Sequence, residues 1–323
     1  MSISPSRGRP QCRPSDMPRL ISGVLLLHKD IGVSSNRALQ LTKRLFNAKK
    51  AGHTGSLDPL ASGVLPICFG EATKFSRFLL EADKIYTVTA KLGIVTSTAD
   101  AEGEIIAQNP VPVFSRETIL AAVSSFLGSG TQIPSMYSAL KHNGQPLYKL
   151  ARQNITIERE ARAIFIYNFD LLDQTPDTLS FSVKCSKGTY IRNLIEDLGT
   201  KLGCGAHVVK LELTQAGPFT IDQTFSLEQL QNMQDIESLI LPLDCLLYGL
   251  PKIQLSAEDA AYFSHGHRIA APLGLSSGLV SLATKEGVFL GIGEAENDGG
   301  IVARRLTAPA TLSLPPSKGA ELR

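Results

Sequence analysis

The sequence predicts an α+β protein in which a large domain with a mixed, largely antiparallel sheet precedes a small β-rich domain. Upstream of about residue 245, strand-like and helix-like segments are interspersed without regular strand–helix alternation, which favours hairpin pairing over a parallel sheet. Downstream, short strands are separated by Gly, Pro, Asn and Asp, as in GLVSLATKEGVFLGIGEAENDGG. The 323 residues, 43% of them hydrophobic, can bury one large core and a satellite domain.

Four segments follow from these patterns. Residues 1–19, rich in Arg, Pro and Ser, are expected to form a disordered basic arm. The large domain is placed at 20–248 and the small β-rich domain at 249–315, with a tail at 316–323.

The first elements of the large domain are predicted from local periodicity. A strand at 22–28 precedes a helix at 34–46, whose leucines and alanine recur at helical spacing and whose N-cap is Ser34 or Ser35. The glycine-rich stretch GHTGSLDPLASG follows as a loop at 52–63. A buried strand is then expected at 63–70 and a helix at 70–82.

Alternation and capping residues predict the later elements. In the strand KIYTVTAKL at 84–92, the side chains of Tyr86, Val88, Ala90 and Leu92 share one face. A helix is expected at 115–128 and a strand at 179–186. A further helix at 189–199 is expected to be capped near Thr189 and stopped by Gly199.

Composition narrows the class of protein. No apolar run approaches the ~20 residues that cross a bilayer. Five scattered cysteines without a C-x-x-C pair, and no metal-ligand spacing around His53, predict a reducing, cytoplasmic protein that holds neither disulfides nor metal. Residues 1–77 contain twelve Lys or Arg against four acidic residues, an imbalance typical of a surface that binds a polyanion.

The glycine-rich loop holds one carboxylate between apolar neighbours. Pro59 biases Asp58 toward an extended backbone, and Leu57 and Leu60 can partly desolvate its side chain. Desolvation raises the pKa of a carboxyl group unless a cation lies close. The pattern by itself is compatible with a turn or capping role for Asp58 and equally with a catalytic or ion-pairing role.

Two other segments also allow both a structural and a functional interpretation. Tyr86 on its apolar strand face is either a core tyrosine or an aromatic platform for a nucleobase. In CSKGTYIR at 185–192, a strand ends and a helix begins, so Tyr190 and Arg192 lie at the first turn. Lys187 and the backbone N–H groups there suit a phosphate, and Arg192 suits a carboxylate, although ordinary helix capping explains the same pattern.

Taken together, four segments resemble the TruB family of tRNA pseudouridine-55 synthases. They are GHTGSLDPLASGVLPICFGEATKF, KIYTVTAKLG followed by TADAEG, QIPSMYSALKHNGQPLYKLAR, and CSKGTYIRNLIEDLGTKLGCGAHV. The resemblance covers roughly residues 20–310 and implies a pseudouridine synthase fold followed by a PUA-like RNA-binding domain. It also implies isomerisation of one uridine in the T-arm of tRNA, without cofactor, metal or protein partner, by a monomeric enzyme.

The resemblance also implies roles for individual residues. Asp58 becomes the essential catalytic aspartate, which attacks the ribose C1′ or removes a ribose proton. Tyr86 stacks on the flipped base, and Arg192 pairs with the aspartate. His53 helps to hold the RNA loop open, and Tyr190 lines the pocket. Further substrate-binding positions are Leu211, Lys74 and Lys187.

The chain departs from the family pattern at a few positions. Glu212 and Leu213 stand where consecutive arginines are usual, so a phosphate contact is not expected there. Two other functions fit parts of the sequence, namely a non-catalytic RNA-binding protein or tRNA chaperone and a guide-RNA-dependent synthase subunit. An RNA chaperone does not need the carboxylate of Asp58, and the continuous segment 96–178 without long Lys-rich tails disfavours the guide-dependent type.

Overall fold

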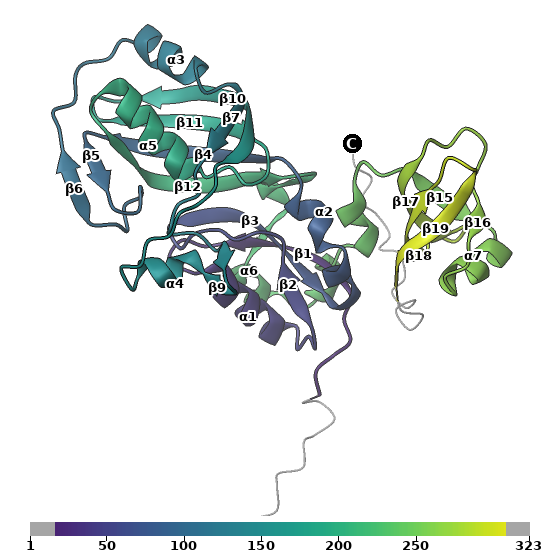
Figure 1. Ribbon diagram of the computed structural model, residues 1–323. Helices are drawn as coiled ribbons and strands as arrows, with labels where there is room; N and C mark the ends of the chain where they lie inside the picture. Colours follow the sequence, from purple (N-terminus) through teal and green to yellow (C-terminus); the bar gives the residue numbers. More distant parts are fainter. Residues whose placement is uncertain (1–16, 308–323) are drawn as a thin grey trace, which may run out of the picture.

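A ten-stranded mixed sheet forms the large domain of the computed structural model, which describes residues 17–307 (Figure 1). The strand order is β14-β1-β3-β12-β4-β11-β10-β7, with β2 beside β3 and β13 beside β12. β12 runs parallel to β3 and β14 parallel to β1, and every other pair in this sheet is antiparallel. The predicted fold class is confirmed. The strands are β1 (Gly23–Lys29), β2 (Ala51–His53), β3 (Ala61–Phe69), β4 (Lys84–Leu92), β7 (Gly128–Gln132), β10 (Arg162–Gln174), β11 (Thr178–Cys185), β12 (Ala206–Ala216), β13 (Phe219–Thr220) and β14 (Phe225–Ser226).

Short helices and two small hairpins complete this domain. The hairpins pair β5 (Ile94–Thr96) with β6 (Ile105–Gln108) and β8 (Lys141–His142) with β9 (Gln145–Pro146). The α-helices are α1 (Ser35–Leu45), α2 (Ser76–Leu80), α3 (Arg116–Ser124), α4 (Leu147–Ala151), α5 (Ile191–Leu202) and α6 (Leu227–Asn232), and the 3₁₀ turns are η2 (Gly70–Lys74), η3 (Ile221–Gln223), η4 (Glu237–Leu239) and η5 (Leu243–Leu247).

Two helix predictions need correction. The expected helix at 70–82 is broken into η2 and α2, with Phe75 between them at a ψ of 0°. The expected helix at 189–199 has Tyr190, next to Thr189, as its N-cap, but it continues past Gly199 to Leu202. Gly203, at a φ of 82°, is the left-handed residue that ends α5. Gly199 instead permits close packing, because a Cβ there would lie 2.2 Å from the Ala206 nitrogen.

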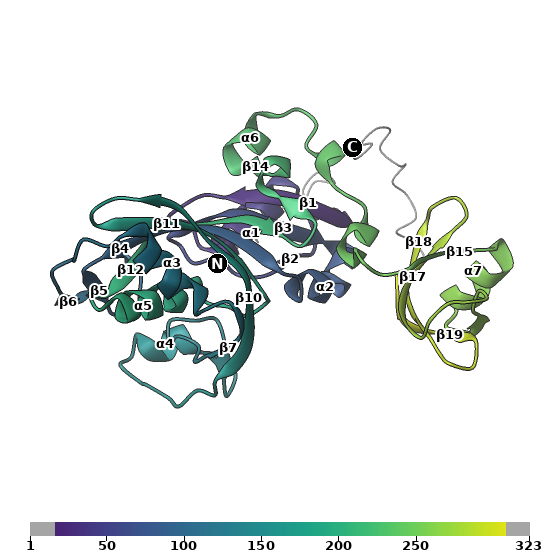
Figure 2. The same cartoon turned by 90° about the horizontal axis from the view of Figure 1, so that it is seen from above.

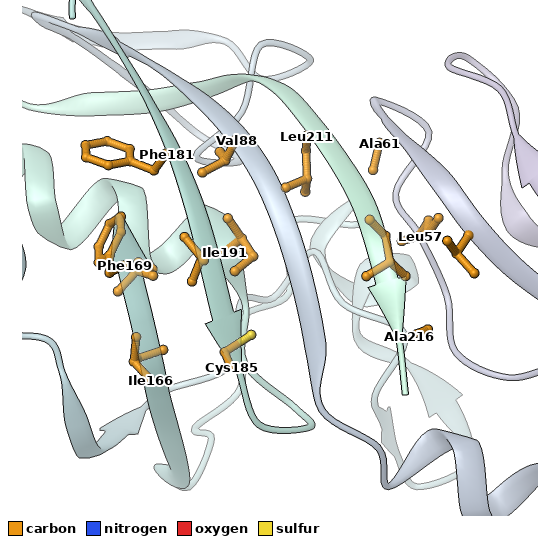
Figure 3. Packing of buried hydrophobic residues seen from close by; sticks show 14 of the residues in the cluster. Leu57, Ala61, Val88, Ile166, Phe169, Phe181, Cys185, Ile191, Leu211 and Ala216 are labelled. Atoms are coloured by element: carbon orange, nitrogen blue, oxygen red, sulfur yellow. The ribbon is translucent and has the colours of Figure 1, made fainter. Parts of the chain in front are cut away.

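Both faces of the sheet are covered around β1 and β3. β3 is buried along its whole length, with α1 and α6 packed on one face. The main core fills the opposite face and joins β4, β11 and β12 to α3 and α5. Figure 3 shows Phe181, Val88 and Leu211, from three neighbouring strands, side by side in this core.

The C-terminal domain is a five-stranded sheet with one helix, which confirms its predicted β-rich character. Its strand order is β15-β17-β18-β19-β16, and Figures 1 and 2 show it at one end of the molecule, beyond α2. The rings of Phe75 and Phe289 meet edge to face, with centroids 5.2 Å apart, where the two domains touch. Its elements are β15 (Lys252–Leu255), α7 (Ala257–Ser264), β16 (Ile269–Ala270), β17 (Gly278–Thr284), β18 (Phe289–Ala295) and β19 (Gly300–Leu306).

Most of the predicted basic arm and tail lies outside the described residues. The last residues of the arm are described, and they contact the large domain: the Arg19 nitrogen donates to the Asn47 carbonyl, and the Asn47 side chain donates to the Met17 carbonyl. Within residues 17–307, no helix is long and apolar enough to span a membrane. The four cysteines of this range are free thiols.

Candidate active site

The catalytic candidate Asp58 lies on a loop between β2 and β3 that the N-terminus of α1 holds in place. The Ser35 hydroxyl donates to the Leu57 carbonyl at 3.0 Å and accepts from the Leu57 nitrogen at 2.8 Å. Leu57 is buried in the main core, which anchors the loop one residue before the carboxylate. The Asp58 carbonyl accepts from Ala61 at 3.1 Å, and the side chain is left free for other partners.

That side chain pairs with Arg192, as expected. The Arg192 Nε lies 2.9 Å from Asp58 Oδ2, and the Arg192 side chain is only 4% exposed whereas that of Asp58 is 39% exposed. Arg192 comes from the first turn of α5, so the contact joins the loop between β2 and β3 to α5. The carboxylate is therefore held by a buried cation on one side and reaches the surface on the other.

The Arg192 guanidinium is fixed by three further contacts. Its Nη1 donates to the Thr98 carbonyl at 2.9 Å, and its Nη2 donates to the Tyr137 carbonyl at 2.8 Å. Nη1 also lies 3.5 Å from Asp100 Oδ2, and the Asp100 carboxylate is equally buried. These partners hold the planar guanidinium in place beside Asp58.

The electrostatic surroundings raise the pKa of Asp58 above its ordinary value. Burial is the largest cause, and the charge of Asp100 acts in the same direction. Arg192 and Lys29 oppose this rise by stabilising the ionised form. A carboxylate with a raised pKa is a stronger proton acceptor than one on the surface, and perturbed groups of this kind are typical of active sites.

The two predicted tyrosines lie within the electrostatic reach of Asp58. Tyr86, half-buried on β4 between Val183 and Leu213, packs against the main core. Burial is the main cause that raises the pKa of its phenol and of Tyr190, and the charge of Asp58 contributes to both. Both hydroxyls therefore stay protonated at neutral pH. Tyr86 thus packs against the core with one part of its side chain and leaves another part accessible, and its role as a platform for a nucleobase stays a prediction.

The remaining predicted residues have identifiable surroundings. Leu211 is buried opposite Ala61 on β3 and Val88 on β4. Lys74 pairs with Glu71 at 2.6 Å and donates to the Leu306 carbonyl of the C-terminal domain at 3.3 Å, and Lys187 pairs with Glu81 at the surface.

His53 ends β2 and is half-buried, and burial lowers the pKa of its imidazole, so the ring is neutral at neutral pH. Its Nδ1 atom is buried without a hydrogen-bond partner in the described part of the chain.

Sequence reasoning missed two charged residues of the site, Lys29 and Asp100. Lys29 ends β1 and is only 1% exposed; its Nζ donates to the carbonyls of Asp30 at 3.0 Å and Val33 at 2.6 Å. Burial lowers the pKa of Lys29 to about 8, against the opposing charge of Asp58. The available signal was a lysine that ends a mostly apolar strand, GVLLLHK. Asp100 lies in the TADAEG segment, whose pattern assigns no role to it.

Comparison with known proteins shows that the fold is that of pseudouridine synthases. A chain of the solved Cbf5–Nop10–Gar1 complex superposes with a TM-score of 0.69 at 26% identity, covering 88% of this chain and 84% of that one. The match with a second solved structure, an H/ACA ribonucleoprotein bound to a substrate RNA containing 2′-deoxyuridine, has a TM-score of 0.68 at 24% identity, covering 89% and 85% of the two chains.

The sequence comparisons define the family. The N-terminal domain of TruB family pseudouridylate synthases matches residues 43–191, and TruB C-terminal domains match 192–248 and 251–307. Proteins named tRNA pseudouridine synthase B are similar: that of Stutzerimonas stutzeri is 51% identical and that of Pseudomonas aeruginosa 50%, each over 89% of this chain and 96% of the relative. The chain belongs to the TruB family of pseudouridylate synthases.

Proposed function

We propose that this protein converts a uridine of tRNA into pseudouridine and that the target is position 55 in the T-arm. The proposal rests on one observation, namely that the partly exposed carboxylate of Asp58 has its Oδ2 atom 2.9 Å from the Nε atom of the buried Arg192. The family membership and the relatives named tRNA pseudouridine synthase B support tRNA as the substrate. Such a protein would meet its substrate in the cytoplasm.

The proposed reaction is an isomerisation that needs no cofactor. The bond between uracil N1 and ribose C1′ breaks, the base rotates, a bond forms between C5 and C1′, and the C5 proton is lost while N1 gains one. Attack at C1′ and removal of a ribose proton both require Asp58 to be ionised. Arg192 supplies the fixed cation that favours this ionised state despite burial.

The other proposed roles concern access to the uridine. The glycosidic carbon is inaccessible inside a folded RNA loop, so the nucleotide must be extruded, which costs a few kcal/mol. The accessible part of Tyr86 offers a stacking face, and base–aromatic stacking is worth ~1–3 kcal/mol. We assign Tyr190 and Leu211 to the pocket wall, His53 to holding the loop open, and Lys74 and Lys187 to RNA phosphates.

The first test uses the protein alone and an unmodified tRNA transcript. Pseudouridine should appear at position 55, and a transcript with cytidine at that position should yield none. Binding without product would favour a non-catalytic RNA-binding protein. Product that requires added guide RNA and protein partners would favour a guide-dependent enzyme.

We further propose that the enzyme acts as a monomer. This proposal rests on the resemblance to the TruB family, which implies a monomeric enzyme. Light scattering of the purified protein should give a mass near 34.7 kDa. A stable dimer mass at the concentrations used in the activity assay would overturn this point.

A further inference from the structure

One surface of the large domain carries positive charge that the proposed active site does not use. Between Asp30 and Asp58 the sequence has five cations and no acidic residue. The five are Arg37, Lys43, Arg44, Lys49 and Lys50, which we call the α1 basic stripe; Lys43 is half-buried and the other four are exposed. Figure 1 shows α1 at the surface of the part of the domain that contains β1, β2 and β3.

Among the described residues, no ion pair neutralises the stripe. In the described range 17–307, no carboxylate lies within 4.0 Å of any of its five cationic groups. Helix α6 packs beside α1, and its first-turn Glu228 forms no ion pair with any described residue of the stripe. A surface of one sign attracts a polyanion, and RNA phosphates are the polyanion that this enzyme meets.

Helix stability accounts for only part of the stripe. Lys43 and Arg44 lie in the last turn of α1, where the helix dipole favours cations. Arg37 is the third residue of the helix, where the same dipole disfavours a cation. The Arg37 nitrogen donates to the capping Ser34 hydroxyl at 3.2 Å, so this position is where a Glu or Gln side chain would complete a capping box. The residue at position 37 is thus unfavourable for the helix.

The stripe also starts next to the proposed catalytic loop. Ser35, two residues before Arg37, forms both hydrogen bonds to Leu57 that hold the Asp58 loop. Arg37 and Arg44 are seven residues apart, so their Cα atoms lie two turns apart on the same side of α1, separated by about 10 Å along the axis. Cations at that spacing can contact different phosphates of one RNA strand.

We propose that the α1 basic stripe is a second RNA-contacting surface, which binds phosphates of the substrate RNA next to the proposed active site. This inference rests on the proposed function. The contacts are made to the backbone, so they add affinity and salt dependence without selecting a base. Arg37 and Arg44, which point the same way from the helix, are the two residues expected to contribute most.

The test compares Arg37→Gln, Arg44→Gln and the double variant with the wild type. Each lost phosphate contact should weaken tRNA binding roughly fivefold at 0.15 M salt, so the double variant should lose on the order of 10- to 30-fold. The slope of log K against log salt should become shallower by about 1.4–1.8 in the double variant. Lys201→Gln is the matched control, because Lys201 is an exposed last-turn cation on α5. It should bind tRNA as the wild type does.

A stability measurement separates RNA binding from a structural role. Arg37→Gln should melt at the same or a higher temperature than the wild type, because it improves the cap, and yet bind tRNA more weakly. The double variant should keep its kcat at saturating tRNA while kcat/KM falls by the same factor as affinity. If the double variant has the same tRNA affinity and salt slope as the wild type, the proposal that the α1 basic stripe binds RNA is refuted, while the proposed function is unaffected. A wild-type protein that makes no pseudouridine would instead overturn the proposed function.

Discussion

Replacing Arg192 with Met tests the structural centre of the site. The change removes the cation from buried Asp100 and from the partly exposed Asp58, and it takes a donor from each of two carbonyls, those of Thr98 and Tyr137. Leaving a buried charge without its partner costs ~3–5 kcal/mol, and each lost hydrogen bond costs about 1 kcal/mol. Asp100 keeps its hydrogen bonds from the Thr98 hydroxyl and the Glu102 nitrogen, which favours the lower bound. We expect a loss of about 5 kcal/mol in the free energy of unfolding.

Urea unfolding followed by far-UV circular dichroism measures this loss, since the chain has no tryptophan for fluorescence. Arg192→Met combined with Asp100→Asn removes the orphaned charge and should recover about 2 kcal/mol. Arg304→Met is the control, because Arg304 and Glu294 form an exposed ion pair worth less than about 1 kcal/mol. A loss below about 1 kcal/mol for Arg192→Met, or no recovery in the double variant, would refute the reasoning. If Arg192→Met does not fold, Arg192→Lys, which keeps the charge and loses the fork, should show a smaller loss.

Three further predictions concern single residues. Tyr86→Leu should slow turnover in a tRNA assay with folding intact, whereas global unfolding would favour a purely structural tyrosine. Burial lowers the pKa of Lys29 to about 8 from 10.5, so between pH 8 and 10.5 the unfolded chain binds more protons than the folded chain. The free energy of unfolding of the wild type should therefore rise by up to ~3 kcal/mol as pH increases through this range. Lys29→Met should lack this gain in denaturation at pH 8 and 10, and a parallel pH dependence would contradict it. Gly199→Ala places a Cβ 2.2 Å from the Ala206 nitrogen and should cost at least about 2 kcal/mol by urea unfolding; a loss within 0.5 kcal/mol would mean that α5 shifts freely.

Local patterns predicted the elements whose periodicity agrees with their burial. The strand with Tyr86, Val88, Ala90 and Leu92 and the helix capped by Ser34 are both where alternation and capping place them. The helix expected at 70–82 is interrupted at Phe75, and the unbroken helical pattern of the sequence does not show this turn. Phe75 packs against Phe289 of the C-terminal domain, a contact between distant segments that a local pattern cannot show.

The site was predictable where a loop residue had an unusual neighbour and unpredictable where a partner comes from a distant segment. Asp58 stands out between Leu57 and Pro59, and Arg192 lies at a recognisable strand-to-helix junction. Asp100 acquires its importance from a contact with Arg192 across the fold, which spacing cannot show. The family resemblance supplied the connection between Asp58 and Arg192, which the structure confirms as an ion pair.

The most direct test of the central claim is pseudouridine formation by Asp58→Asn. This nearly isosteric change removes the negative charge and leaves the loop, Ser35 and Leu57 in place. We predict that the variant binds unmodified tRNA within a few-fold of the wild type and forms no pseudouridine in single-turnover reactions. Pseudouridine formed by Asp58→Asn at a rate near that of the wild type would contradict the account.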